Sequence, residues 1–262
     1  MSRQDELKLD TFYKVAQLIA TQAGEQILKN FSYDVIPEWK ADGSPLTKTD
    51  IEINTMVIDT IKKNFPTHAV LGEEENHNFQ NNEYVWCCDP IDGTVPFAHG
   101  LPLSTFSLAL LKNGEPIIGI VNEPYRNLLF SAIKGQGAYL NNKRKLRVNN
   151  YKKLTSKVIF VDGLAIDTSV YNAISAKKAF TCSYLSFIYG AKQVATGHFI
   201  GAIYYGTKPW DVATIKIIVE EAGGLCTSIN GKTQRYDKPI DGFVASNRIV
   251  HDELIAITLK NV

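Results

Sequence analysis

The sequence predicts a fold that mixes α and β structure, with an antiparallel sheet in its first half and alternating strands and helices in its second. Apolar residues of 5–31 recur at helical spacing, which predicts one long amphipathic helix. Two apolar runs within 104–124 are joined through Asn113-Gly114, a strong signal for an antiparallel hairpin. Beyond residue 157, short apolar runs alternate with helix-prone segments, which is typical of layered α/β structure.

The first half begins with two predicted helices, 5–31 and about 50–64, separated by a segment rich in proline, glycine and polar residues. That segment, 37–50, is expected to be a loop. The strands expected in this half are 69–72, 84–88, the two runs of the hairpin, 127–133 and 137–141.

The second half is expected to contain strand 157–163, helices 168–179 and 186–197, strand 202–206, helix 210–222 and strand 242–246. We therefore expect a boundary near 148–155. It divides the chain into an α+β half, 1–150, and an α/β half, 151–262, each with part of the acidic set described below.

Composition excludes several classes of function. The chain has 262 residues, a net charge of +1 and no apolar run long enough to span a membrane, so no overall field attracts it to nucleic acid or lipid. The basic segment 143–153 is expected to be an ordinary solvated surface. The N-terminus carries no apolar signal segment, and the four cysteines form no CxxC pair. These features predict a cytoplasmic protein whose cysteines are small buried apolar residues.

One motif combines carboxylates with the end of a strand. The apolar run 84–88 leads directly into DPIDGT (89–94). The proline restricts the backbone between the two acids, and the glycine permits a tight turn. Asp89, Asp92 and the Ile91 carbonyl are thereby directed to one point. Oxygen ligands of this kind suit Mg²⁺, Mn²⁺ or Ca²⁺, and the absence of histidine and cysteine ligands argues against zinc.

Three other acids lie at element ends, and each has an ordinary explanation. Glu73 belongs to a run of three glutamates that could simply be solvated. Asp211 opens a predicted helix, where the helix dipole favours an acid, and Asp50 could cap the helix that begins beside it. Alternatively, all three acids lie close to the DPIDGT motif in the folded chain and form one site with it.

The motifs GEE (72–74), DPIDGT (89–94) and WDVA (210–213), with the loop 40–50 and EEAGG (220–224), resemble the inositol monophosphatase family of metal-dependent, lithium-sensitive phosphatases. The resemblance covers about residues 5–258. It implies a layered α-β-α-β-α sandwich of the inositol monophosphatase and fructose-1,6-bisphosphatase type. It also implies a homodimer that hydrolyses a small phosphorylated metabolite with two or three Mg²⁺, with Mn²⁺ as an alternative and Li⁺ and Ca²⁺ as inhibitors.

The resemblance also assigns roles to residues. One metal would be held by Glu73, Asp89 and the Ile91 carbonyl, a second by Asp89, Asp92 and Asp211, and a weaker third by Glu73 with Asp50. The catalytic residues would be Thr94, Asp50 and Glu73, the first two polarising the attacking water. The residues expected to contact the substrate are Asp92, Gly93, Thr94, Phe187, Tyr204 and Asp211. Carboxylates gathered in this way would repel one another unless divalent cations neutralised them.

The substrate pocket departs from the family pattern. Tyr204 stands where inositol-specific members carry a glutamate, and 182–187 lacks the arginine and glycine of their sugar-binding stretch. Both changes weigh against myo-inositol 1-phosphate and leave open histidinol phosphate, fructose 1,6-bisphosphate and 3′-phosphoadenosine 5′-phosphate. An aromatic pocket made by Tyr184, Phe187, Tyr204 and Tyr205 would favour a ring or nucleotide. The alternative from another class is a weakly catalytic relative that binds RNA or a protein.

Overall fold

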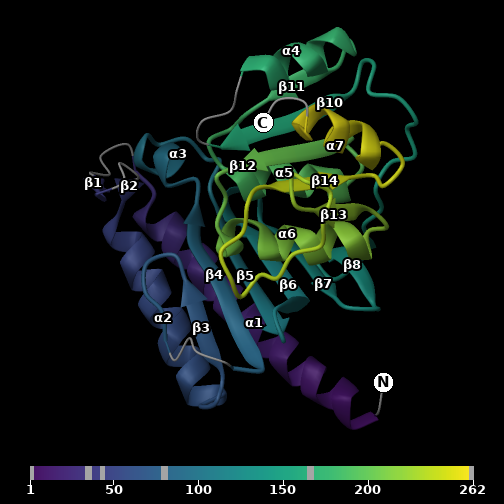
Figure 1. The fold of residues 1–262 in the computed structure, drawn as a ribbon. Coiled ribbons are helices and arrows are strands. Elements are labelled where there is room, and N and C mark those ends of the chain that lie inside the picture. The colour runs from purple at the N-terminus through teal and green to yellow at the C-terminus, as the bar shows by residue number, and fades with distance from the viewer. Residues whose placement is uncertain (1–2, 33–36, 42–44, 78–81, 164–167, 260–262) are drawn as a thin grey trace.

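The computed structural model describes residues 3–32, 37–41, 45–77, 82–163 and 168–259, which form five layers in the order helix, sheet, helix, sheet, helix (Figure 1). The layered sandwich expected from the sequence is confirmed. No helix within the described ranges has the length and apolar character needed to cross a membrane.

The first layer consists of α1 (Arg3–Asn30) and α2 (Lys48–Asn64), which lie side by side on one face of a large sheet (Figure 1). Ile19 of α1 and Val57 of α2 are fully buried, and both belong to one apolar cluster with Trp86 and Cys88 of the sheet. The helical spacing of apolar residues therefore predicted the face of each helix that packs on the sheet.

Seven strands form the large sheet, in the spatial order of the chain. They are β3 (Ala69–Gly72), β4 (Tyr84–Asp92), β5 (Thr105–Lys112), β6 (Glu115–Glu123), β7 (Leu128–Ile133), β8 (Gly137–Leu140) and β9 (Arg144–Lys145). Among the described strands of this sheet, β3 and β4 are the one parallel pair. The hairpin predicted at Asn113-Gly114 is confirmed, and both residues have the positive φ that its tight turn requires, 53° and 84°.

The middle layer consists of α5 (Phe187–Ala195) and α6 (Pro209–Glu221). A single apolar cluster joins these helices to both sheets, and it includes Cys87 of β4 and Ala202 of the second sheet. Because Cys88 packs in the opposite cluster against α1 and α2, the two adjacent cysteines face opposite sides of the sheet, as the strand periodicity predicted.

The second sheet has the strand order β11-β10-β12-β14-β13 and is covered on its outer face by two helices. Its strands are β10 (Val158–Gly163), β11 (Phe180–Cys182), β12 (Gly201–Tyr205), β13 (Leu225–Thr227) and β14 (Phe243–Ser246), and the helices are α4 (Thr168–Ala176) and α7 (His251–Leu259). The sequence patterns did not predict β11, β13 or α7. The two strands are three residues long, too short to show a period. In α7, Leu254 and Ile257 are buried in the outer cluster and the partly buried Ile255 packs against it.

The predicted loop 37–50 contains a two-stranded pair, β1 (Glu38–Trp39) with β2 (Pro45–Leu46), and residues 42–44 of it lie outside the described part of the chain. The division at 148–155 stays a prediction. The boundary falls between β9 and β10, and hence between the strands of the two sheets, but helices α5 and α6 pack against both.

A buried ion pair connects the large sheet to the middle layer. Lys192 of α5 and Glu123 of β6 are 0% and 1% exposed, and Lys192 Nζ lies 2.9 Å from Glu123 Oε2. Lys192 also donates a hydrogen bond of 2.8 Å to the Tyr189 carbonyl and lies 3.7 Å from the centre of the Tyr189 ring. Burial lowers the pKa of Lys192 to about 8, although Glu123 opposes the shift.

We expect Lys192→Met to lower the free energy of unfolding by about 3–5 kcal/mol, because the buried Glu123 then keeps the exposed Arg126 as its one ionic partner among the described residues. The double change Lys192→Met with Glu123→Leu should recover most of that loss. Urea denaturation measures both, with Lys14→Met in an exposed pair as the control, expected to change stability by less than about 1 kcal/mol. A single variant as stable as the control would contradict this role.

Candidate active site

A bulge in β4 directs both motif aspartates to the same side. Asp89 pairs with Ser107 of β5, but Asp92 pairs with Thr105, so three residues of β4 advance against two of its partner. In a regular strand, residues three apart point to opposite faces, and the extra residue removes that alternation. The sequence predicted a strand over 84–88, but the strand continues to Asp92. Proline is tolerated at such an irregularity.

Gly93 turns the chain from β4 into the short helix α3 (Thr94–Ala98). Its φ is 86°, which favours glycine, and a Cβ atom built on it would lie 2.7 Å from the Cβ of Ser186. Glycine is thus required both for the turn and for the close approach of α5.

The motif opens into a cavity of about 350 Å³. Its lining residues are Pro45, Glu73, Asp89, Ile91, Asp92, Gly93, Thr94, Val95, Asp162, Gly163, Leu185, Phe187, Tyr204 and Asp211. The cavity therefore brings together nine of the predicted metal and substrate residues: Glu73, Asp89, Ile91, Asp92, Gly93, Thr94, Phe187, Tyr204 and Asp211. Asp50, assigned to the weaker third metal, is not among the lining residues. Tyr184 and Tyr205 do not line the cavity, so two of the four predicted aromatic residues, Phe187 and Tyr204, contribute to its wall. Tyr205 packs with the outer apolar cluster of the second sheet, because adjacent strand residues face opposite sides.

Asp92 is held by the first turn of α5. Its Oδ1 accepts a hydrogen bond of 2.9 Å from the Phe187 N–H, and its Oδ2 accepts one of 3.1 Å from the Tyr189 N–H. The hydroxyls of Ser186 and Thr105 donate to Oδ2 at 2.5 and 3.2 Å. Asp92 thus accepts hydrogen bonds from helix N–H groups that have no partner within the helix. The positive end of the helix dipole stabilises its negative charge. Burial nevertheless raises its pKa.

Asp50 combines the two explanations that the sequence left open. Its Oδ2 accepts a hydrogen bond of 2.9 Å from the Thr47 N–H, so it caps α2. Its Oδ1 accepts one of 3.3 Å from the Thr94 hydroxyl, which lies 3.0 Å from the Ile91 carbonyl. Burial raises the pKa of Asp50 to about 7. A helix cap is therefore also in contact with the predicted catalytic threonine.

Asp89 is the least satisfied of the acids. Its Oδ1 is buried and has no hydrogen-bond partner, and burial together with Glu73, Asp92 and Asp211 raises its pKa. An isolated carboxylate in this position is costly unless it is protonated or bound to a cation.

Glu73 and Asp211 approach the cavity from β3 and α6. The Lys40 ammonium lies 2.9 Å from Glu73 and 2.6 Å from Glu74, and although burial opposes it, the two acids raise the pKa of Lys40. Asp211 Oδ2 accepts hydrogen bonds from the Lys208 N–H (2.7 Å) and the Thr207 hydroxyl (3.1 Å). Burial and the charge of Glu73 raise the pKa of Asp211 to about 8.

These contacts determine how the acids could hold a metal. Within the ranges that the structure describes, no three His, Cys, Asp or Glu side chains lie close enough together to enclose an ion as they stand. Three of the carboxylates are instead held by Lys40, by the α5 N–H groups and by Thr207. The donor set still fits a hard cation: it consists of oxygen atoms, it contains four carboxyl groups, and it includes the unpartnered Asp89 Oδ1.

Asp162, Lys40 and Ser186 are site residues that sequence reasoning missed. Asp162 carried the same signal as Glu73 and Asp89, an acid at the end of an apolar strand, and could have been found by it. Lys40 and Ser186 lie far from their partners in sequence, and no local pattern marks them.

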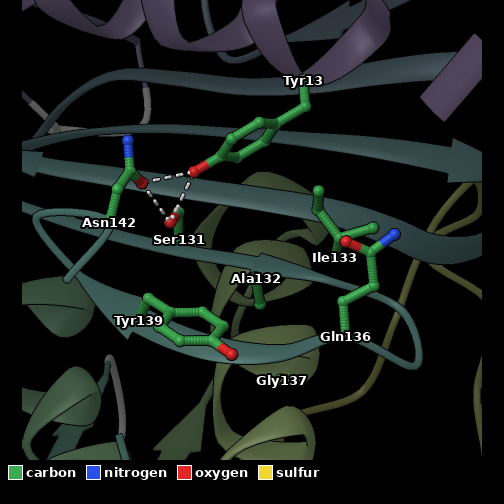
Figure 2. Close-up of a pocket in the computed structure, with 8 residues that line it drawn as sticks. All are labelled: Tyr13, Ser131, Ala132, Ile133, Gln136, Gly137, Tyr139 and Asn142. Carbon is green, nitrogen blue, oxygen red and sulfur yellow. Dashed lines mark hydrogen bonds between the residues drawn. The ribbon is translucent and has the colours of Figure 1, made fainter. Parts of the chain in front are cut away.

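A second cavity of about 340 Å³ lies between α1 and strands β7 and β8 (Figure 2). All its lining residues are uncharged: Tyr13, Ser131, Ala132, Ile133, Gln136, Gly137, Tyr139 and Asn142. The Tyr13 hydroxyl is hydrogen-bonded to Ser131 (2.8 Å) and Asn142 (2.6 Å), which fixes α1 to the sheet. Without a charged group, this cavity is not suited to a metal or a phosphate.

Comparison with known proteins identifies the family of the chain. A model of the inositol monophosphatase family matches residues 8–262. The chain belongs to this family. It is 34% identical over 214 residues, 81% of either chain, to the fructose-1,6-bisphosphatase/inositol-1-monophosphatase of Thermotoga maritima. It is 30% identical over 267 residues to the putative Nus factor SuhB of Neisseria meningitidis serogroup B, covering 96% of this chain and 98% of that protein.

A solved structure extends the family assignment to the fold. The inositol monophosphatase of Anabaena (Nostoc) sp. PCC 7120 superposes with a TM-score of 0.85 and 27% identity, covering 97% of this chain and 98% of that one. As a member of the inositol monophosphatase family, the protein is a phosphoric monoester hydrolase.

The raised pKa values predict how the metal-free protein responds to pH. Folded Asp211 keeps its proton to about pH 8, and Asp50 to about pH 7, whereas unfolded aspartate releases it near 3.8. Between these values the folded chain binds more protons, so stability should fall as the pH rises. We expect the melting temperature in EDTA to be lower at about pH 8.5 than at about pH 5.5.

Calorimetry at the two pH values measures this effect. Excess Mg²⁺ should remove most of the difference, and Asp211→Asn should reduce it. A melting temperature in EDTA that rises with pH over this interval would contradict the proposed burial of the acids.

Proposed function

We propose that the protein hydrolyses a small phosphate monoester with water in a reaction that depends on Mg²⁺. The observation that carries the proposal is the unpartnered Asp89 Oδ1 in a cavity shared with Glu73, Asp92 and Asp211. Such a cavity is stable in the ionised form only with cations, and oxygen ligands favour Mg²⁺. Family membership supports the reaction class.

The chain divides the work between two groups of residues. Glu73, Asp89, Asp92, Asp211 and the Ile91 carbonyl would hold the metal ions. Mg²⁺ supplies the positive charge that neutralises the carboxylates, makes water more acidic and stabilises negative charge on the phosphoryl oxygens. Since Glu73 is paired with Lys40, its use as a ligand requires that ion pair to separate.

Thr94 and Asp50 would accept the proton that the attacking water releases. The Thr94 hydroxyl, 3.3 Å from Asp50 Oδ1, can accept a proton from water while its own proton passes to the carboxylate. The burial that raises the pKa of Asp50 to about 7 makes this carboxylate a suitable acceptor near neutral pH. The oxygen of water then bonds to phosphorus, the bond to the alcohol oxygen breaks, and the alcohol takes up a proton from solvent.

We expect Asp89→Asn to lower kcat by about 100-fold or more, because it removes a charge shared by the metal ligands. EDTA should abolish activity of the wild type, and Mg²⁺ should restore it. Phosphate release from a panel of monoesters measures both effects. The matched control is Glu75→Gln, an exposed acid of the same segment, which should leave kcat unchanged. Activity that survives EDTA, or an Asp89→Asn variant as active as the control, would refute the proposal.

Further features belong to the same proposal. Mn²⁺ should replace Mg²⁺, whereas Li⁺ and Ca²⁺ should inhibit. The protein should act in the cytoplasm as a homodimer, as the family resemblance implies.

A second candidate function rests on one relative and one surface. The relative from Neisseria meningitidis is named as a putative Nus factor. In this chain, the six basic residues of segment 143–153 are all exposed: Lys143, Arg144, Lys145, Arg147, Lys152 and Lys153. If this segment bound RNA, binding would weaken with salt and with Lys143→Ala, Arg144→Ala and Lys145→Ala combined. The near-zero net charge and the complete acidic set favour the phosphatase.

A further inference from the structure

A carboxylate that the metal site does not require faces the same cavity. Asp162 of β10 is the register partner of Tyr204 on the parallel neighbour β12. Partners in register project to the same face of a sheet, and both residues line the cavity. The preceding residue of each strand, Val161 or Ile203, packs in the apolar cluster on the outer face of the sheet. Asp162 and Tyr204 therefore face the opposite side, toward the cavity.

Asp162 is fixed in position by its own turn. Its Oδ1 accepts a hydrogen bond of 2.8 Å from the Gly163 N–H. Gly163 has a φ of 125°, and a Cβ atom there would lie 2.2 Å from the Tyr205 carbonyl oxygen, so only glycine fits. Asp162 Oδ2 is buried and accepts no hydrogen bond of good geometry. Burial raises the pKa of Asp162, and the nearby Ser183 side chain and Leu185 backbone partly oppose this shift. Hydrogen-bonding capacity therefore remains at the cavity wall.

An aromatic wall stands beside this carboxylate. The rings of Phe187 and Tyr204 stack with their centres 4.1 Å apart and their planes at 12°. The Phe187 N–H also donates to Asp92, so the wall adjoins the predicted phosphate end of the cavity. Burial and the surrounding acids raise the pKa of Tyr204, which keeps its hydroxyl protonated.

The cavity offers nothing to a second anion. Its described lining contains five acids, Glu73, Asp89, Asp92, Asp162 and Asp211, and no lysine, arginine or histidine. Neighbouring Lys40 is already paired with two glutamates. The segments 42–44 and 164–167 contribute no basic residue by sequence. A second phosphate would meet like charge without a cation to offset it.

We propose that Asp162 selects the alcohol part of the substrate: it accepts hydrogen bonds from donors on a leaving group that carries no second phosphate. This inference rests on the proposed phosphatase activity. The shared chemistry is a non-anionic alcohol with hydrogen-bond donors, supplied either by neighbouring hydroxyls, as in a sugar or polyol, or by an ammonium group. Asp162 acts on the substrate directly, beside the stacked pair of Phe187 and Tyr204.

The test compares four monoesters in Mg²⁺: glucitol 6-phosphate, phosphoethanolamine, fructose 1-phosphate and 4-nitrophenyl phosphate, whose alcohol part carries no hydrogen-bond donor. Fructose 1,6-bisphosphate is measured as well, for comparison with fructose 1-phosphate. Asp162→Leu should lower kcat/KM for donor-bearing substrates by about 10- to 100-fold, mainly through KM, and leave 4-nitrophenyl phosphate within about twofold. Asp162→Asn should retain much of the activity on hydroxyl donors but lose it on an ammonium donor, which identifies the source.

Fructose 1,6-bisphosphate should be hydrolysed no faster than fructose 1-phosphate. The control is Asp59→Asn, an exposed acid on α2, and melting temperatures establish that each variant is folded. Equal losses on all substrates, no loss on any, or a bisphosphate preferred by more than about tenfold would overturn the role of Asp162 alone. Wild type that releases no phosphate from any substrate would overturn the proposed function itself, and this inference with it.

Discussion

The contact between Asp92 and the first turn of α5 is the constraint on which the site depends. Asp92 ends a strand of the large sheet, and α5 lies between the sheets, so their hydrogen bonds fix the motif against the middle layer. Gly93 permits the close approach that these bonds need. The buried pair of Lys192 and Glu123 joins the same helix to the large sheet at a second point. The N–H groups at the start of α5 thus hold Asp92 in place beside the other acids, although their charges repel it.

The cavity concentrates acids that the fold alone does not neutralise. Asp50, Asp89 and Asp211 are pushed toward their protonated forms by burial, and Glu73 is balanced only by Lys40. A protein that retains such a set carries an energetic cost in the absence of cations. The proposed use of Mg²⁺ turns this cost into binding energy for the metal and into an electrostatic field for a phosphoryl group.

Much of the fold could be predicted from periodicity. The helical spacing in α1, the alternation in the strands and the Asn113-Gly114 turn each depend on local chemistry that a single sequence displays. Elements of three residues, such as β11 and β13, escaped because no period can be seen in so short a run. The bulge at Asp89–Asp92 escaped because strand pairing with β5, and not the local sequence, determines it.

The acids of the site could be predicted because each lies near the beginning or the end of an element, and the family resemblance then grouped them. Their partners could not, since Lys40 and Ser186 reach the acids only through tertiary packing. Asp162 was overlooked because no motif of the family includes it, although its position at a strand end is the same signal.

Titration calorimetry of Mg²⁺ binding, in two buffers of different ionisation enthalpy near pH 7, tests the central claim most directly. If buried, partly protonated carboxylates hold the ion, binding must release protons, and Asp89→Asn must weaken it severely. We expect the measured binding enthalpy of the wild type to differ between the two buffers. Binding without proton release, or equal affinity in Asp89→Asn, would contradict it.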